Sequence, residues 1–330
     1  MRRLKYNVLV ARYKVRRWLE QFDNPQLRNA RRLLRVLRST SQPDVVYIGD
    51  STVSFTAPGD VDKRRLSVMV DEFLPDQSLF AIFGGSYHAD LIADYVNLIG
   101  LTGARPVLVV PLWIRGRYVP WIEHPVFGHK RAMAYLRTIR RRTPTRSIRQ
   151  GFPAPSAQEF AEFYALRHKT FLGDLPIGDY INPLKDRDRW KGKEDERVRM
   201  LHAYHHGAAL TPGSPAMDAV VKLGRAVREL GCPVVVYQTP VPVESGVGYF
   251  GEEFADLARA NFAALDAAFT EGLGRPIEII QSGTIFPTSE FIDVAGADEH
   301  LNEAGRRRLA ALIATAVGRE LDARGQTGQL

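Results

Sequence analysis

The sequence predicts an α/β fold of three layers, with helices on both faces of a five-stranded parallel sheet. Five short runs are continuously apolar, as in strands that are buried on both faces. Segments with apolar residues at helical spacing separate these runs. Strands that alternate with helices in this way form parallel, doubly wound sheets, whose ligands bind at the carboxyl ends of the strands. The five runs are residues 45–48, 79–83, 107–112, 234–237 and 277–280.

The helices beside this sheet are indicated by apolar residues three or four positions apart, which share one face of a helix. Two of these stripes lie on either side of the second strand, one precedes the fourth strand, one precedes the fifth, and one follows it. The stripes are Leu66, Val70 and Phe73; Leu91, Ile92, Tyr95 and Leu98; Val220, Leu223, Val227 and Leu230; Phe254, Leu257, Phe262 and Leu265; and Leu309, Leu312, Ile313, Val317 and Leu321.

Two regions depart from the regular alternation of strands and helices. Residues 1–42 are predicted to be a basic helical extension in front of the α/β/α domain, which spans residues 43–325. Residues 149–212 separate the third and fourth strands and are rich in charge and proline. A structureless loop of that length would be unusual, so we predict a helical insertion or lid over the strand ends. The second helix of the extension is built on Leu27, Leu33, Leu34 and Leu37.

The composition is that of an ordinary globular protein, with 45% apolar and 25% charged residues. No apolar run approaches the roughly 20 residues that a bilayer span needs, and the basic N-terminus lacks the apolar core of a secretory signal. The single cysteine, Cys232, excludes an internal disulfide framework, and we interpret it as a small buried side chain. These features favour a reducing, cytoplasmic setting.

Positive charge is concentrated at the N-terminus. Residues 1–40 hold twelve Lys and Arg but only two acidic residues, Glu20 and Asp23, which gives this segment a net charge of +10. The net charge of the whole chain is +8, so the other residues together carry −2. A second basic cluster spans residues 130–149. Residues 1–22 also hold apolar side chains, which suits peripheral contact with a membrane surface; the alternative is packing onto the α/β body. The basic residues are not accompanied by any recognised nucleic-acid-binding module, so we do not expect nucleic-acid binding.

A serine follows the first predicted strand, in the sequence Gly49-Asp50-Ser51. At the carboxyl end of a central strand, just before a helical segment, its hydroxyl would lie in the ligand crevice, with its backbone N–H directed toward an oxyanion formed there. Gly49 would allow the chain to turn sharply. The alternative is an ordinary turn or helix cap, in which Gly, Asp and Ser are all common.

A histidine, His300, stands just before the last predicted helix. A loop in that place returns to the edge of the sheet where Ser51 lies, which is where a serine nucleophile needs its general base. Another group, His202, His205 and His206, lacks a spaced carboxylate or cysteine partner. We therefore interpret it as a polar surface turn, and predict neither a metal site nor an organic cofactor.

Three blocks of this chain resemble those of the SGNH (GDSL-like) hydrolases, in the family's order. They are residues 43–51, residues 83–91, and His300-Leu301-Asn302 followed by Gly305. The resemblance covers most of the chain, roughly residues 43–320, and implies a flavodoxin-like sheet of the SGNH type. It further implies Ser51 as nucleophile, His300 as base, and the backbone N–H groups of Ser51 and Gly85 as oxyanion-hole donors.

Two positions depart from the family's pattern. Trp113 stands where the family has an oxyanion-hole asparagine; its indole N–H can donate, Arg115 is a second substitute, and packing of the indole is the alternative. Ala297 stands where the family has the aspartate of the triad. Asp298 and Asp293 are the available carboxylates, and we favour Asp298 because it is nearer to the histidine. A helix cap and a loop turn are their respective alternatives.

Within the family, residues 110–115 with Trp121 and Pro125, and residues 237–242, resemble a bacterial branch often linked to surface-polysaccharide loci. That likeness implies an O-acyl group on a carbohydrate as the substrate, with Arg115 and Asp50 as substrate-binding candidates. The leading hypothesis is therefore a serine-dependent ester hydrolase. The alternatives are an O-acyltransferase acting on a glycan, and a catalytically impaired protein of the same fold that binds a glycan or a membrane.

Overall fold

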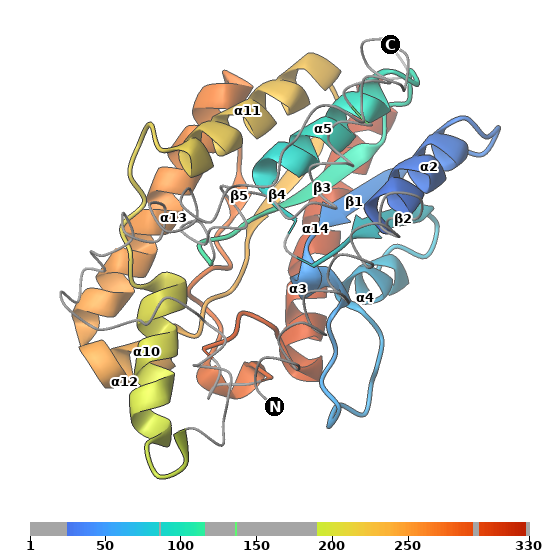
Figure 1. Ribbon diagram of the computed structural model, residues 1–330. Helices are drawn as coiled ribbons and strands as arrows, with labels where there is room; N and C mark the ends of the chain where they lie inside the picture. Colours follow the sequence, from blue (N-terminus) through green and yellow to red (C-terminus); the bar gives the residue numbers. More distant parts are fainter. Residues whose placement is uncertain (1–24, 86, 116–135, 137–189, 293–296, 328–330) are drawn as a thin grey trace, which may run out of the picture.

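Five parallel strands form the centre of the molecule (Figure 1). In the computed structural model, residues 25–85, 87–115, 136, 190–292 and 297–327 are described, and the statements below concern them. The strand order is β2-β1-β3-β4-β5, and every neighbouring pair is parallel. The strands are β1 (Val45–Gly49), β2 (Leu79–Phe83), β3 (Val107–Leu112), β4 (Val234–Gln238) and β5 (Ile279–Ile280).

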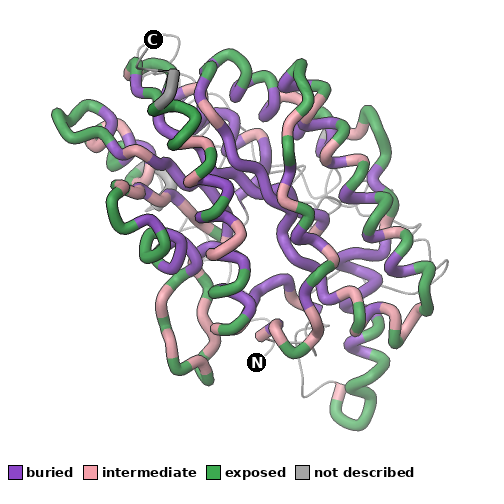
Figure 2. The backbone as a smooth tube through the Cα atoms, turned by 180° about the vertical axis from the view of Figure 1, so that it is seen from behind, coloured by how far each residue is buried: buried purple, intermediate pink, exposed green. Residues whose placement is uncertain are grey.

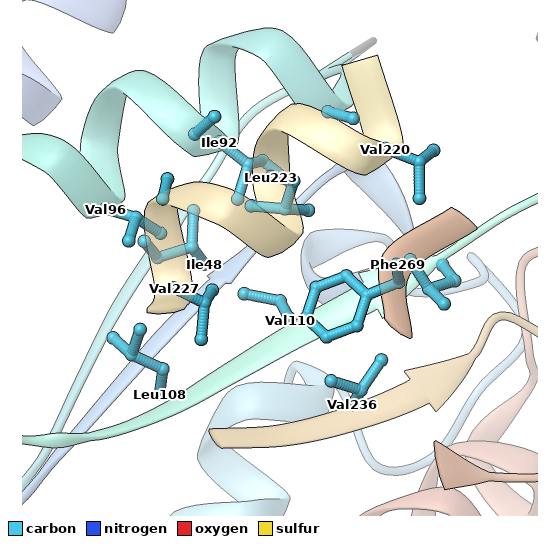
Figure 3. Close-up of a cluster of buried hydrophobic side chains, with 14 of the residues drawn as sticks. Ile48, Ile92, Val96, Leu108, Val110, Val220, Leu223, Val227, Val236 and Phe269 are labelled. Carbon is cyan, nitrogen blue, oxygen red and sulfur yellow. The ribbon is translucent and has the colours of Figure 1, made fainter. Parts of the chain in front are cut away.

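Successive residues of the strands contribute to two separate hydrophobic cores, because side chains alternate between the faces of a sheet. Val46 and Ile48 of β1 belong to one core, whereas Val45 and Tyr47 belong to the other. Figure 3 shows the first core, with Ile48, Leu108, Val110 and Val236 from the strands beneath side chains of the covering helices. Helices α2 (Pro25–Leu37), α5 (Ala89–Gly100), α11 (Pro215–Leu230) and α13 (Glu252–Leu273) contribute to this core.

The opposite face of the sheet is covered by α4 (Leu66–Glu72) and α14 (Glu303–Thr327). Seen from that side, the strands are buried while the outer faces of the helices are exposed (Figure 2). The architecture is therefore α/β/α, as predicted. The remaining elements are α3 (Ser51–Ser54), α10 (Glu194–His206), α12 (Val243–Phe250) and the 3₁₀ turn Thr288–Glu290.

The ends of α11 show how local chemistry fixes an element of this fold. Ser214 precedes the helix and its hydroxyl accepts a hydrogen bond from the N–H of Met217, at 3.4 Å. Pro215 follows at the first helical position, where its missing N–H costs nothing. Gly231 ends the helix in the left-handed conformation, with φ of 67°, which glycine adopts without steric penalty.

Most sequence-based expectations for the fold are confirmed. β2 and β3 have the expected bounds, β1 and β4 each continue one residue further, and β5 is shorter than predicted. The four apolar side chains predicted for α5 are buried, whereas Phe73, assigned to the stripe of α4, is 41% exposed and ends that helix. Cys232 is buried, as predicted.

The two irregular regions are described in part. The second predicted helix of residues 1–42 is α2, whose Ala30, Leu33 and Leu37 are fully buried in the core shared with α5. Within residues 149–212, the described part contains α10. Residues 1–22, 130–135 and 137–189 lie outside the described residues, so membrane contact by the N-terminus stays a prediction. Among the described helices, none is both long and apolar enough to span a membrane.

Candidate active site

The candidate site lies at the carboxyl ends of β1, β2 and β3. β1 lies between β2 and β3, so the connection from β1 to β2 and the connection from β2 to β3 run in opposite directions along the sheet. Ligands of open α/β sheets bind at such a switch point. Gly49 at the end of β1 pairs with Phe83 at the end of β2. Ser51 lies two positions after Gly49, and Gly85 lies two positions after Phe83, so the two residues follow the ends of neighbouring strands.

A tight turn carries Ser51 from β1 into α3. Asp50 caps this helix: its Oδ1 accepts hydrogen bonds from the N–H of Thr52 at 2.9 Å and from the Thr52 hydroxyl at 2.6 Å. A Cβ at Gly49 would lie 2.2 Å from Cγ2 of Val53, so any other residue would push α3 away from the strand. The short turn therefore fixes where the Ser51 hydroxyl stands. Contact of the buried Asp50 with a substrate stays a prediction.

Two buried tyrosines lie beneath this turn, and the sequence patterns did not indicate them as part of the site. The hydroxyl of Tyr47 on β1 donates a hydrogen bond to the hydroxyl of Tyr237 on β4, at 2.7 Å, although β3 lies between the two strands. Both side chains are fully buried, and burial raises the pKa of each hydroxyl. They therefore stay protonated and provide a rigid, uncharged floor beneath the turn.

The structure brings His300 to Ser51 from the other end of the chain. Its Nε2 lies 3.0 Å from the Ser51 hydroxyl oxygen, although 249 positions separate the two residues. Phe55, just beyond α3, stacks on the imidazole, with ring centroids 4.6 Å apart and an interplanar angle of 30°. This ring covers one face of the imidazole while remaining 45% exposed itself.

Asp298 is the acidic partner of His300. Its Oδ1 lies 2.6 Å from Nδ1 of the imidazole, and the same oxygen accepts a hydrogen bond from the guanidinium of Arg115. Burial alone would raise the pKa of this carboxyl, but the contact with His300 and the charge of Arg115 outweigh burial and hold the pKa well below its usual range. Asp298 is therefore ionised, which favours the imidazole tautomer that has its proton on Nδ1 and a free lone pair facing Ser51.

Short antiparallel pairing fixes the backbone around His300. The N–H of Ile292 donates to the carbonyl of His300, and the N–H of Asn302 donates to the carbonyl of Glu290, both at 2.9 Å. A Cβ at Gly305 would lie 2.6 Å from that same Glu290 carbonyl, so glycine is required there. Asn302, rather than Asp298, caps the start of α14 through the N–H of Gly305, at 3.2 Å. The capping alternative for Asp298 therefore does not apply.

Arg306 on the first turns of α14 connects this loop to the one after α3. It is 1% exposed, donates to the carbonyl of Leu301 at 3.0 Å and pairs with Asp60 at 2.7 Å. Further hydrogen bonds run to the carbonyls of Asp62 and Arg64. The sequence offered no signal for this role, since Arg306 stands in a run of three arginines and its partners in the other loop, Asp60, Asp62 and Arg64, lie more than 240 positions away.

The predicted oxyanion-hole residues stand on neighbouring strand ends. Gly85 is exposed, and a Cβ there would meet no neighbour, so its environment leaves space for a substrate. Trp113 is 2% exposed and belongs to the core that contains α5 and α11, which supports its packing role. Donation by its indole to a substrate stays a prediction.

The histidine group was predicted as a polar surface turn, and this was wrong. His202, His205 and His206 lie on α10 and are at most 5% exposed. The helix buries them because they fill the space between α10 and the elements next to it, including Phe254 of α13. Within the described ranges, no group of three or more His, Cys, Asp or Glu side chains is arranged to hold a metal ion. Asp293, the other candidate acid, lies outside the described residues.

No protein-family model matches the chain, and no curated protein or solved structure matches it either. The fold and the site define its class on their own: an α/β/α protein with a serine, a histidine and an aspartate in contact at the carboxyl edge of a parallel sheet.

Proposed function

We propose that this chain is a serine-dependent ester hydrolase of the SGNH type that removes O-acyl groups from a carbohydrate. The observation that carries the proposal is the pair of contacts to His300: Nε2 is 3.0 Å from the Ser51 hydroxyl, and Nδ1 is 2.6 Å from Asp298. A hydroxyl within reach of an imidazole that is oriented by a carboxylate is the arrangement nucleophilic acyl transfer requires.

In the first half of the reaction, the Ser51 oxygen bonds to the acyl carbon while its proton moves to Nε2 of His300. Asp298 stays ionised and stabilises the imidazolium that forms. The negative charge that develops on the carbonyl oxygen is bound by the N–H groups of Ser51 and Gly85. His300 then gives its proton to the leaving alcohol, the bond between acyl carbon and alcohol oxygen breaks, and an acyl-enzyme remains.

In the second half, water replaces the alcohol. His300 takes a proton from the water as the water oxygen bonds to the acyl carbon. The bond to the Ser51 oxygen then breaks, the free acid leaves, and the proton returns to Ser51. Each step uses groups of the chain and the two substrates only.

The surroundings of the three residues support this assignment. Arg115 keeps Asp298 charged, and the ring of Phe55 shields one face of His300 from water, which strengthens the electrostatic contacts of the imidazole. The half-exposed ring also offers an apolar surface next to the nucleophile, where the acyl chain or the apolar face of a sugar can lie.

The proposal is tested with a fluorophosphonate, which reacts with activated serines. Intact-mass spectrometry should show a single adduct on the wild type and none on Ser51→Ala. Ser54→Ala is the matched control, because Ser54 lies on the same short helix and donates to the Ser51 carbonyl; it should be labelled like the wild type. Equal labelling of wild type and Ser51→Ala would end the assignment.

The substrate class is tested separately by release of acid. The wild type should release acetate from O-acetylated oligosaccharides with kcat/KM higher than from p-nitrophenyl acetate, and Ser51→Ala should release none. Activity on the aryl ester alone would keep the hydrolase assignment and remove the carbohydrate from it.

A further inference from the structure

The segment that carries the acid is attached to α10 by a buried histidine. Nε2 of His206 lies 3.1 Å from the carbonyl oxygen of Ala297, the residue directly before Asp298. Both His206 and Ala297 are buried. The contact joins a helix of the long connection between β3 and β4 to the catalytic loop before α14, across 91 positions of sequence.

Ala297 has an uncommon backbone conformation. Its φ is 49°, and it is the only non-glycine residue with positive φ in the described part of the chain. A residue with a Cβ pays a steric cost in this left-handed region, so the surroundings must hold it there. The left-handed residue turns the chain immediately before Asp298, whose carboxylate then meets both Arg115 and His300.

His206 can supply the hydrogen bond that holds this turn. Burial is the main cause that lowers its pKa to about 3, with contributions from His202 and Arg115, so the ring is neutral near pH 7. A carbonyl oxygen only accepts, so Nε2 carries the proton and donates. In the part of the chain that the structure describes, Nδ1 has no hydrogen-bond partner, which leaves the Ala297 carbonyl as the ring's polar contact.

The ring itself is held in place by neighbours on two helices, and one of these neighbours is in turn bound to a third helix. Phe254 of α13 meets the imidazole edge-on, with centroids 6.4 Å apart and an interplanar angle of 88°. His202, one turn earlier on α10, lies 6.4 Å from it between centroids and is itself within 2.8 Å of the Ser245 hydroxyl on α12. The donor on His206 therefore has a defined direction.

We propose that His206 is a positioning residue of the active site, which holds the Ala297 carbonyl so that Asp298 faces Nδ1 of His300. The inference rests on the proposed function, since it concerns the acid of the same site. It assigns a role to α10, which the sequence-based assignment of the three blocks did not include. Two contacts then hold the acid: Arg115 binds its side chain, and His206 fixes the backbone just before it.

The test compares His206→Phe, which keeps an aromatic ring without a donor, with His206→Gln, which keeps a side-chain N–H. With an O-acetylated or p-nitrophenyl ester, His206→Phe should lower kcat by about 100-fold with little change in KM, the size expected when a catalytic group is displaced by about 1 Å. His206→Gln should restore most of kcat.

A purely structural role would give another result. If His206→Phe only lowers the folded fraction, kcat falls in proportion to that fraction and His206→Gln rescues nothing; this outcome overturns the proposal, as does an unchanged kcat. Ala297→Gly sharpens the test, because glycine adopts positive φ without the steric cost. In that background, His206→Phe should cost less than in the wild type.

The tether can also be measured without turnover. In proton NMR, with His300 assigned from His300→Gln, the Nδ1–H resonance of His300 should lie at lower field in the wild type than in His206→Phe, because the variant's imidazole loses its contact with Asp298. The same chemical shift in both proteins would overturn the tether. If Ser51 fails to react with a fluorophosphonate while this resonance moves as expected, the proposed function fails and the tether stands.

Discussion

The two halves of the candidate site are built in different ways. The nucleophile turn, residues 49–55, is held by contacts within a few positions: Asp50 with Thr52, and Gly49 against Val53. The acid–base loop, residues 297–302, pairs with residues 290–292 and is also held from far along the chain, by Arg115 and His206. The first half is therefore encoded locally, whereas the second exists only when the whole domain is folded.

This difference teaches where substitutions should have their effects. A change in the nucleophile turn alters one short helix and its neighbours. A change in a residue that contacts the acid–base loop can act from a distant part of the chain, because Arg115 and His206 reach the loop from there. The predictions that follow test this contrast, beginning with the largest effect.

Asp298→Asn should lower kcat by about 10⁴-fold, because the amide cannot hold the Nδ1 proton of His300 and so favours the wrong tautomer. The measurement is kcat for ester hydrolysis, with circular dichroism to show that the fold is retained. Asp256→Asn is the control: Asp256 is 72% exposed and pairs with Arg259 on the surface of α13, so activity should be unchanged. A loss of less than tenfold in Asp298→Asn would assign the acid to another residue.

Arg306→Met should lower the free energy of unfolding by about 3–5 kcal/mol, because it leaves the carboxylate of Asp60, whose side chain is 6% exposed, without its charge partner. Both loops of the site lose their link, so kcat should fall as well. Urea unfolding measures the first effect. Arg319 lies on α14, like Arg306, and forms an exposed ion pair with Glu278. Arg319→Met should therefore change the free energy of unfolding by less than about 1 kcal/mol. Equal effects would show that Arg306 is not a structural link.

The buried histidines of α10 should make the protein less stable in acid. Burial lowers the pKa of His202 to about 4, so below its ordinary value near 6.5 the unfolded chain binds a proton that the folded chain does not. Stability contributed by the neutral ring is therefore present above pH 6.5 and is lost as the pH falls toward 4, by roughly 1–3 kcal/mol. Urea unfolding at several pH values measures this loss.

His202→Gln provides the comparison, since it can still hydrogen-bond Ser245 but does not titrate. The difference in the free energy of unfolding between wild type and variant should narrow from pH 6.5 to pH 4. Asp60 and Asp298 do not interfere, because their pKa values are lowered and the stability that they contribute is lost only below about pH 4. Parallel curves for the two proteins would show that His202 is not buried in its neutral form.

Asp50→Ala should have the smallest effect on stability, about 1 kcal/mol, which is the usual cost of a lost helix cap. Asp50→Asn keeps an oxygen for the N–H of Thr52 and should unfold like the wild type. Differential scanning calorimetry measures both. If Asp50→Ala destabilised the protein more than Arg306→Met, the nucleophile turn would depend on the tertiary structure more than the acid–base loop does, and the contrast drawn above would be reversed.

The contrast also explains what could be predicted of the site. Ser51 was found because Gly49-Asp50-Ser51 ends an apolar strand, and the same few residues build the turn. His300 and Asp298 were chosen by their place before the last helix, and the structure brings His300 to Ser51 and Asp298 to His300. Arg306 and His206 were missed. The sequence does not distinguish a buried arginine within a basic run from an exposed one, nor a buried histidine on a polar helix from an exposed one.

What the sequence determined by itself is the set of strands and helices and their order along the chain. Continuous apolar runs and stripes at helical spacing are local patterns, and a strand such as β3 or a helix such as α5 requires little beyond them. A tight turn around Ser51 is equally local. These features follow from the periodicity of the backbone, which any short stretch of sequence reveals.

The tertiary structure alone decided which side chains share a contact across the molecule. The contact of His206 with the Ala297 carbonyl joins segments that are 91 positions apart, and the contact of Asp298 with Arg115 joins segments that are 183 positions apart. Such contacts depend on how the layers pack, because burial changes both the charge and the hydrogen-bond partners of a side chain. No local pattern carries that information.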